Sequence, residues 1–363
     1  MAYTTIDDPS AYFTTLLYTG NATDDRNLTN SANAGDFKPD ILWLKERSST
    51  SSHQLHDSTR GSSFAVLTDQ DNAAEDEDGN RVQAFQTNGF QIGTASTVNQ
   101  DTITMVAWQW KCNGGTTTNN DASSTGIGTH DSVIQANTTA GLSIVTWTGN
   151  AEPETLAHGL GGTPEMIIIK NRPTTEGFWV GASAAGSIAG GKNLTLGNTN
   201  AVATNSTSFV NQDPTSTVFR VGGSNSAADA KVNGNGHAML AYCFRSIQGY
   251  SKIGSYIGNG STNGTFIYTG FKPGWLMVKG ISANSREWFL FDGTRDTFNP
   301  FAKYVKAEST DAEASSAFGD FCSNGFKVRS DGASYNASGQ TFVYMAFAEH
   351  PFVSSEGVPT TAK

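Results

Sequence analysis

Three stretches of the chain share one pattern: TITMVAWQWK at residues 102–111, GHAMLAYCFR at 236–245 and TFVYMAFAEH at 341–350. Each alternates aromatic or aliphatic residues with small or polar ones, which is the period-two pattern of a β-strand. The match aligns one alanine from each stretch: Ala107, Ala241 and Ala346. A strand type that returns along a long chain predicts three copies of one β unit.

A second motif precedes each of these strands. A proline, an apolar run and a lysine recur in FKPDILWLK, TPEMIIIK and FKPGWLMVK. Proline favours the entry of a strand, and the apolar run predicts a buried strand. We expect Trp43, Ile168 and Leu276 to lie in equivalent strands and in the core. We expect the lysines to mark the exit of each strand into solvent: Lys45, Lys170 and Lys279.

A third motif opens each unit, where an aromatic residue stands two positions before Gly-Asn in LLYTGN, VTWTGN and GSYIGN. Together the motifs predict an all-β protein of three tandem β-sandwich repeats, jelly-roll-like in type. The expected segments are an N-terminal segment 1–11, repeats 12–112, 141–246 and 250–353, a linker 113–140 and a C-terminal tail 354–363. Within the linker, the low-complexity run 113–121 is expected to be flexible and residues 132–136 to be strand-like.

The first and third repeats share features that the second lacks. Both contain Asn-Gly between apolar flanks, at Asn88 and Asn324, which predicts a tight hairpin. Both also contain an Asp-x-Thr-Arg sequence, at 57–60 and 292–295. In the second repeat a longer loop, 211–216, replaces the hairpin turn.

Composition excludes several classes of protein. The net charge is −10, and no Lys/Arg cluster offers the cations that a nucleic acid needs. No apolar run is long enough for a membrane helix, and residues 1–13 lack the pattern of a signal peptide. The three cysteines are far apart, without metal-ligand spacing, and we expect free thiols, no cofactor and no metal.

The phrases FKPDILWLKERSS, SIVTWTGN, GYSKIGSYIGNG, FIYTGFKPGWLMVK and YMAFAEHPF resemble a family of repeat-containing tail-fibre or virion structural proteins of marine tailed bacteriophages. The resemblance covers nearly the whole chain. It implies a β-rich protein on the virion surface, with other virion proteins as partners and no catalytic residues to carry over. A protein of this kind is made in the host cytoplasm and leaves on the particle.

Residues of catalytic type occur without the setting that catalysis needs. His53, His56, Asp57 and Ser58 supply the types of a Ser-His-Asp triad, but the two histidines align with strand residues of the third repeat. The sequence HGLGG from His158 resembles an oxyanion loop, yet no G-x-S-x-G turn accompanies it. We expect no enzyme activity.

An acidic stretch at 69–78 offers oxygen atoms that could hold calcium. It lacks the spacing of an EF-hand loop, so a solvated charge run is the simpler interpretation.

The loops after the proline-containing strands differ most between the repeats. A β-sandwich that displays unlike loops is a common binding scaffold, although drift of hairpin loops would give the same pattern. The candidate receptor contacts are polar or aromatic residues of these loops: Arg47, Ser49, Arg172, Glu176, Trp179, Asn284, Arg286 and Trp288.

We expect a virion structural protein in a tail fibre or appendage that adheres to a host glycan and forms a homo-oligomer, a trimer among the options. A capsid decoration protein is the alternative, and a particle-borne glycan hydrolase or esterase a distant one.

Overall fold

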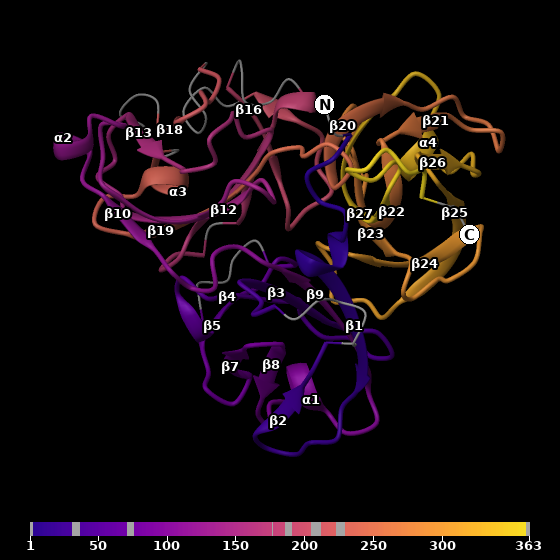
Figure 1. Ribbon diagram of the computed structural model, residues 1–363, viewed down its shortest axis with the longest axis horizontal. Coiled ribbons are helices and arrows are strands. Elements are labelled where there is room, and N and C mark those ends of the chain that lie inside the picture. Colours follow the sequence, from indigo (N-terminus) through magenta and orange to yellow (C-terminus); the bar gives the residue numbers. More distant parts are fainter. Residues whose placement is uncertain are drawn as a thin grey trace.

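The computed structural model describes residues 3–30, 37–70, 76–175, 177–185, 191–204, 212–222 and 229–360. Within these ranges the chain is all-β, as predicted: antiparallel sheets dominate, and each helix is about one turn long. Three lobes surround a common centre (Figure 1). We call them unit 1, unit 2 and unit 3, in chain order, after the predicted repeats; the exact boundaries of those repeats stay a prediction.

Unit 1 has a main sheet of order β1-β9-β3-β4-β5-β6 and a small sheet of order β2-β8-β7. The main strands are β1 (Phe13–Thr19), β9 (Thr104–Trp110), β3 (Ile41–Glu46), β4 (Gln54–Asp57), β5 (Gly61–Val66) and β6 (Asp76–Glu77). The small sheet contains β2 (Arg26–Leu28), β8 (Gly89–Ile92) and β7 (Val82–Gln86); the helical turns are η1 (Pro9–Ala11) and α1 (Ser96–Asn99).

Unit 2 has a main sheet of order β10-β11-β12-β19-β14-β15-β16-β17 and a small sheet β13-β18. The main strands are β10 (Thr118–Asn120), β11 (Ser132–Asn137), β12 (Leu142–Thr148), β19 (Ala238–Phe244), β14 (Met166–Asn171), β15 (Trp179–Ala182), β16 (Lys192–Thr195) and β17 (Ala203–Thr204). The remaining elements are β13 (Glu154–Ala157), β18 (Val218–Val221), α2 (Ala122–Thr125), η2 (Ser183–Ala185) and α3 (Asp229–Asn233).

Unit 3 forms one continuous sheet of order β20-β27-β22-β23-β24-β25-β26-β21. Its strands are β20 (Ser251–Ile257), β27 (Thr341–Pro351), β22 (Phe271–Gly280), β23 (Trp288–Asp292), β24 (Phe301–Lys306), β25 (Ala314–Cys322), β26 (Gly325–Val328) and β21 (Phe266–Tyr268), with α4 (Ala333–Asn336). In all three units the opening strand pairs with the closing strand, which pairs in turn with the proline-containing strand or its counterpart. The motifs therefore occupy the same places in each unit.

Each main sheet is covered on both faces. One face packs on elements of its own unit and forms a separate outer core, with Leu42 in unit 1, Ile167 in unit 2 and Leu276 in unit 3. The other face of every sheet contributes to one central core shared by the three units. Trp43, Trp108, Tyr242, Trp275 and Phe347 are among its members. The units are therefore parts of one packed body and not separate beads on a string.

The hydrogen-bonded register corrects the alignment of the third repeat. Ala107 pairs with Leu44 one residue before Lys45, and Ala241 pairs with Ile169 one residue before Lys170. The residue before Lys279, however, pairs with Tyr344 and not with Ala346. Trp43, Ile168 and Leu276 are buried in the equivalent strands β3, β14 and β22, as expected. Leu276 lies three positions before its lysine and faces the outer core, whereas Trp43 and Ile168 lie two positions before theirs and face the central one. The alignment on Ala346 had therefore shifted the closing strand of unit 3 by two residues, which is one period of a β-strand.

The lysines of the second motif do not exit into solvent. Lys45, Lys170 and Lys279 are at most 1% exposed. The ammonium of Lys45 donates to the carbonyls of Glu46 and Thr310, and that of Lys279 to the carbonyl of Arg286. Burial lowers the pKa of Lys45 and of Lys279 to about 8. The prediction was wrong because the ammonium groups find carbonyl partners near the strand ends: Lys45 in a loop of unit 3, and Lys170 and Lys279 in the loop of their own unit that follows the strand.

The Gly-Asn motif has a partner that the sequence analysis missed. A fully buried asparagine at the end of the short helix in each unit bonds to the motif's asparagine: Asn99 to Asn21, Asn233 to Asn150 and Asn336 to Asn259. The glycine lies against the same turn, and a methyl group on Gly20 would overlap the carbonyl oxygen of Gln100. The motif therefore fixes the outer core to the opening strand.

The predicted hairpins of units 1 and 3 are confirmed, with the turn moved by one residue. Gln86 pairs with Gly89 and Cys322 with Gly325, so Asn88 and Asn324 are turn residues while each glycine begins the next strand. A methyl group on either glycine would overlap the backbone of the neighbouring strand, at Leu28 or Ile267. The corresponding loop of unit 2 begins at residue 211, which lies outside the described residues.

The linker 113–140 contains β10, α2 and β11, so the strand expected at 132–136 is present, whereas the run 113–121, expected to be flexible, contains β10. Both strands extend the main sheet of unit 2. The Gln135 side chain bonds to Ser58 and Thr59 of unit 1 and accepts the backbone N–H of Asn113 and Gly115. Low-complexity composition predicted flexibility, but these tertiary hydrogen bonds hold the segment in place.

Candidate functional site at the seams between the units

The Asp-x-Thr-Arg sequence of unit 3 forms an ion pair at the seam, our term for the contact between two units, with unit 1. The side chains of Asp292 and Arg295 are 0% exposed, and the guanidinium donates to the carboxylate. The indole of Trp108, in unit 1, donates to the same carboxylate at 3.0 Å, and the guanidinium carbon lies 5.2 Å from the Trp108 ring centroid. A charge-assisted hydrogen bond and a cation–π contact therefore join the two units.

Unit 1 makes the equivalent contact with unit 2. Arg60 donates to Asp57 at 2.5 Å, and both side chains are 0% exposed. The hydroxyl of Tyr242, in unit 2, donates to the same carboxylate at 2.7 Å. Tyr242 occupies the place of Trp108, because each pairs with the residue two positions before the buried lysine.

The third seam, between units 2 and 3, has an apolar version of this contact. Ala182 pairs with Met166, as Asp57 pairs with Ile41, so alanine stands where the other units carry aspartate. Met345 occupies the place of Trp108 and Tyr242, since it pairs with Met277 two positions before Lys279. Both Ala182 and Met345 are buried in the central core. The acid and its hydrogen-bond donor are thus replaced together by apolar residues at these two positions.

The candidate loop of unit 1 lies against unit 3. Arg47 forms a bidentate ion pair with Glu313, with both nitrogen–oxygen distances 2.9 Å, and its side chain is 17% exposed. Arg295 also donates to Glu313, so this carboxylate bridges two arginines. Ser49 is half-buried, and its hydroxyl bonds to the carboxylate of Glu46.

The candidate loop of unit 2 is engaged similarly. The guanidinium carbon of Arg172 lies 5.8 Å from the ring centroid of Phe64 in unit 1, and Arg172 also lines a large surface hollow. Trp179 is 9% exposed, with the Lys231 ammonium 4.5 Å from its ring centroid. Glu176 lies outside the described residues.

The candidate loop of unit 3 lies against unit 2. Asn284 is exposed, but its side-chain oxygen accepts the N–H of Ala201 at 2.8 Å. The backbone N–H of Arg286 donates to Thr199, and its guanidinium donates to Gln340.

Trp288, behind this loop, is 1% exposed, and its indole donates to the carbonyl of Thr195. The structure thus brings the three loops to equivalent places, as expected, but each of them touches a neighbouring unit.

The residues of catalytic type are separated or already paired. His53 accepts the indole N–H of Trp43 at 2.8 Å, and its other ring nitrogen donates to the carbonyl of Lys306. Ser58 donates to Asp40 and not to a histidine. Burial holds the pKa of His53 well below its usual value and lowers that of His56 to about 3. These imidazoles are neutral structural groups in this arrangement.

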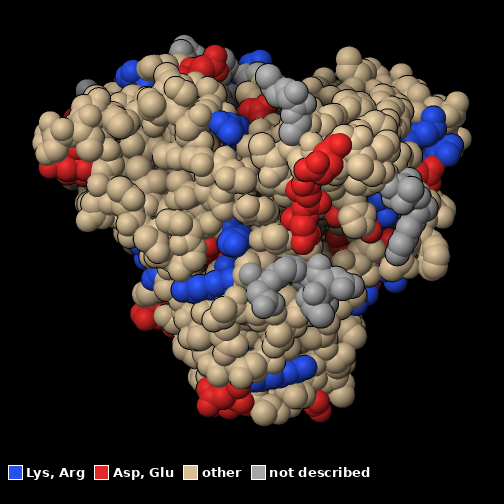
Figure 2. Space-filling model, viewed as in Figure 1, with Lys and Arg blue, Asp and Glu red and all other residues tan. Residues whose placement is uncertain are grey.

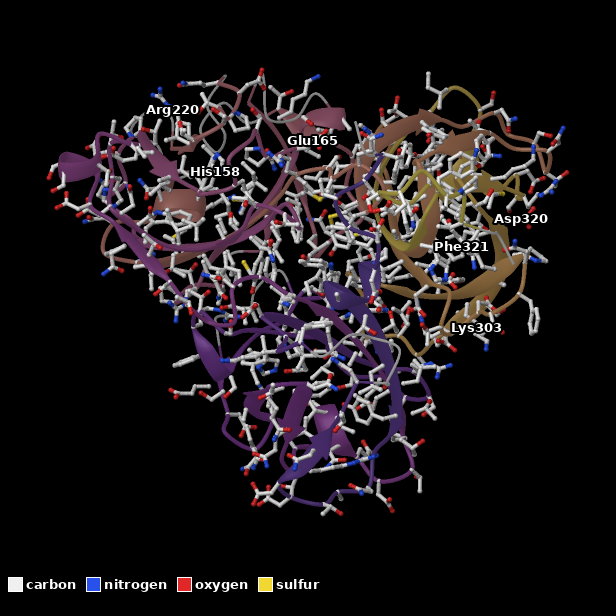
Figure 3. All side chains as sticks on the ribbon, in the orientation of Figure 1. His158, Glu165, Arg220, Lys303, Asp320 and Phe321 are labelled. Carbon is white, nitrogen blue, oxygen red and sulfur yellow. The ribbon has the colours of Figure 1, made fainter. Side chains whose placement is uncertain are left out.

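His158 lies inside unit 2 (Figure 3), and its ring bonds to the backbone of Thr215 and Leu160. Burial lowers its pKa to about 4. It lies in the connection between β13 and β14, ahead of the apolar strand, where the sequence alignment had indicated a turn.

In the described part of the acidic stretch, Asp69 accepts the N–H of His53 and Asp78 pairs with Arg81; residues 71–75 are not described. Across the described ranges, no three His, Cys, Asp or Glu side chains are placed to hold a metal, and no helix is long and apolar enough to cross a membrane. Cys112, Cys243 and Cys322 are free thiols.

Sequence reasoning missed the seam partners Trp108, Tyr242 and Glu313. One signal could have indicated the two aromatic partners. The Asp-x-Thr-Arg sequence occurs only in the first and third repeats. The closing strands that contact these sequences belong to the first and second repeats and carry Trp108 and Tyr242 at the same position of the strand. Without the order in which the units touch, that coincidence has no interpretation.

A family model for a domain of unknown function, DUF7483, matches residues 8–351. The chain belongs to the DUF7483 family. The matched region includes all three units, both buried ion pairs and the extra strands β10 and β11. In this protein the DUF7483 domain is therefore the whole three-unit body and not a single repeat. A search of curated proteins finds no match to this DUF7483 chain.

Proposed function

We propose that this DUF7483 protein is a structural component of a tailed-bacteriophage particle, in a tail fibre or appendage, with an adhesive role toward a host glycan. The resemblance of its repeated phrases to phage virion proteins supports this proposal. It acts without catalysis and assembles with other virion proteins, as a homo-oligomer on the particle surface.

The single observation that carries the proposal is the way the units are joined. Two seams bury complete ion pairs, and all three main sheets share one central core. Such a body presents its outer surface rigidly, because relative movement of the units would expose both charge pairs and apolar faces. Rigid display suits a protein whose task is to hold a surface in position on a particle.

The charge distribution favours an uncharged ligand. On the face seen in Figure 2, charged residues form small separate groups on a surface made mostly of uncharged residues. Only 15% of all residues are charged. A chain with many Ser, Thr and Asn residues brings to such a surface hydroxyls and amides, which hydrogen-bond a polar glycan.

A second candidate function is capsid decoration, in which the protein studs or stabilises the shell. One observation favours it: the three loops that adhesion was expected to use are in contact with neighbouring units, including the Arg47–Glu313 pair. A broad three-lobed body (Figure 1) also suits attachment to a shell.

Cryo-electron microscopy of the particle tests both candidates. A fibre or appendage places the protein at the tail in a small multiple of roughly three or six copies, whereas decoration places on the order of dozens to hundreds on the shell. Absence from the particle would refute both. Release of sugars from host polysaccharide by the purified protein would instead support the hydrolase alternative.

A further inference from the structure

Unit 2 carries a surface hollow of about 860 Å³, which is within the range of roughly 300–1,000 Å³ typical of small-molecule sites. All its lining residues lie between 119 and 238, so it belongs to this unit alone. Its floor comes from the ends of β11, β12 and β19, and one wall comes from the segment around β10.

This wall exists because unit 2 has two strands without counterparts in the described parts of the other units. In units 1 and 3 the main sheet ends at the opening strand, β1 or β20, whereas in unit 2 β11 and β10 continue the sheet beyond β12. The sequence indicated a strand at 132–136, within a linker, but not that it would extend the sheet of unit 2. An insertion that is ordered, joins the sheet and encloses a hollow has the form of an added binding feature.

Most residues that line the hollow have hydrogen-bonding side chains, among which Asp121, Asp131 and Arg172 carry charge, although the surface that the lining exposes is somewhat more apolar than polar. Asn119, Asn235 and Thr148 are exposed, and Thr146 is half-buried on the floor. Asp131 uses one carboxylate oxygen to accept the N–H of Ala122.

Charge and polarity limit the ligand class. A polyanion would meet the carboxylates of Asp121 and Asp131, with the Arg172 guanidinium as the cation among the lining residues. The apolar part of the lining includes Val133, Trp147 and Ala238 and lies among polar side chains, so a ligand needs both apolar and hydrogen-bonding surface. Amides and hydroxyls, which both donate and accept, match the hydroxyl groups of a sugar.

We propose that this hollow binds a neutral oligosaccharide of the host surface, an inference that rests on the adhesive part of the proposed function. Adhesion then occurs at this one site and not at the three seam loops. Arg172 belongs both to the site and to the seam loop of unit 2. Several weak sites on one particle would together give firm attachment.

The decisive variant is Thr148→Trp, which places an indole inside the hollow. Thr19→Trp is the matched control, because Thr19 occupies the same place in unit 1, is also exposed and lies where no β10–β11 extension is present. Asn235→Ala is a second variant that removes hydrogen-bonding atoms without adding bulk. Near-ultraviolet circular dichroism and thermal melting of each full-length variant confirm folding.

The probes are an array of neutral and acidic oligosaccharides and intact host cells. We expect the wild type and Thr19→Trp to bind neutral glycans alike, Thr148→Trp to lose at least about tenfold, and Asn235→Ala to lose about threefold to tenfold. If the wild type and Thr148→Trp adhere equally to cells and glycans, the hollow is not the site, although the proposed function stands. If the wild type binds neither probe, the adhesive function falls as well.

Discussion

Replacement of Asp57 by alanine tests whether the buried ion pairs hold the units together. The carboxylate accepts hydrogen bonds from Arg60 at 2.5 Å and from Tyr242 of unit 2 at 2.7 Å, and it also accepts the backbone N–H groups of Thr59 and Arg60. Without it, the Arg60 guanidinium remains in a site where its side chain is 0% exposed. Removing one partner of a buried pair costs about 3–5 kcal/mol, which is a large part of the 5–15 kcal/mol typical of whole proteins.

Urea unfolding followed by tryptophan fluorescence measures this loss. The chain offers a matched control in Asp78→Ala, which breaks an Asp–Arg pair of the same spacing whose aspartate side chain is 34% exposed. We expect that control to cost below about 1 kcal/mol. The double variant Asp57→Ala/Arg60→Met removes the buried charge altogether and should recover at least about half of the loss, because a well-packed apolar side chain can replace a buried ion pair.

A free energy of unfolding of Asp57→Ala close to that of Asp78→Ala would show that the buried ion pair does not hold the units together. A double variant less stable than Asp57→Ala alone would show that the unpaired Arg60 charge is not the source of the lost stability.

Three further predictions follow from the shared core, the Gly-Asn motif and the buried histidines. Residues 12–112 expressed alone should associate or aggregate in size-exclusion chromatography, because their central face loses its cover; a stable monomer would contradict the shared core. Gly20→Ala should lower the free energy of unfolding by about 1–3 kcal/mol, since its methyl group meets the Gln100 carbonyl, whereas Gly79→Ala, with open space around it, should be nearly neutral. The free energy of unfolding of the wild type should fall as pH falls from about 6.5 toward 3, because the unfolded His56 imidazole takes up a proton that the folded one, with a pKa of about 3, does not. Urea titrations at pH 7.5 and 5 measure this loss, which should be smaller in His56→Phe than in the wild type. An equal loss in the two proteins would contradict this prediction.

The repeated motifs were sufficient to predict the class of fold and the places of its principal strands. Period-two alternation in the closing strands and continuous apolar runs such as ILWL depend on local geometry, and a strand forms wherever its side chains can be buried. The hairpins at Asn88 and Asn324 were equally local. Even the error in aligning Ala346 left the strand itself in place, because a shift of two residues keeps the same face inward.

The apolar runs do not indicate which elements pack against the second face of each sheet. Most residues of the candidate site are positioned by that packing. Lys45 is polar by sequence and buried in the fold, because a loop of unit 3 lies over it. Arg47 was expected to meet a receptor and instead meets Glu313.

The partners that decide the chemistry of the seams are remote in sequence: 184 residues separate Trp108 from Asp292, and 185 separate Asp57 from Tyr242. The sequence by itself determined the strands, their repetition and the all-β class, since these follow from neighbouring residues. Only the tertiary structure decided which charges are buried, which loops are free and where a hollow opens, because each of these depends on how three sheets pack their second faces against one another.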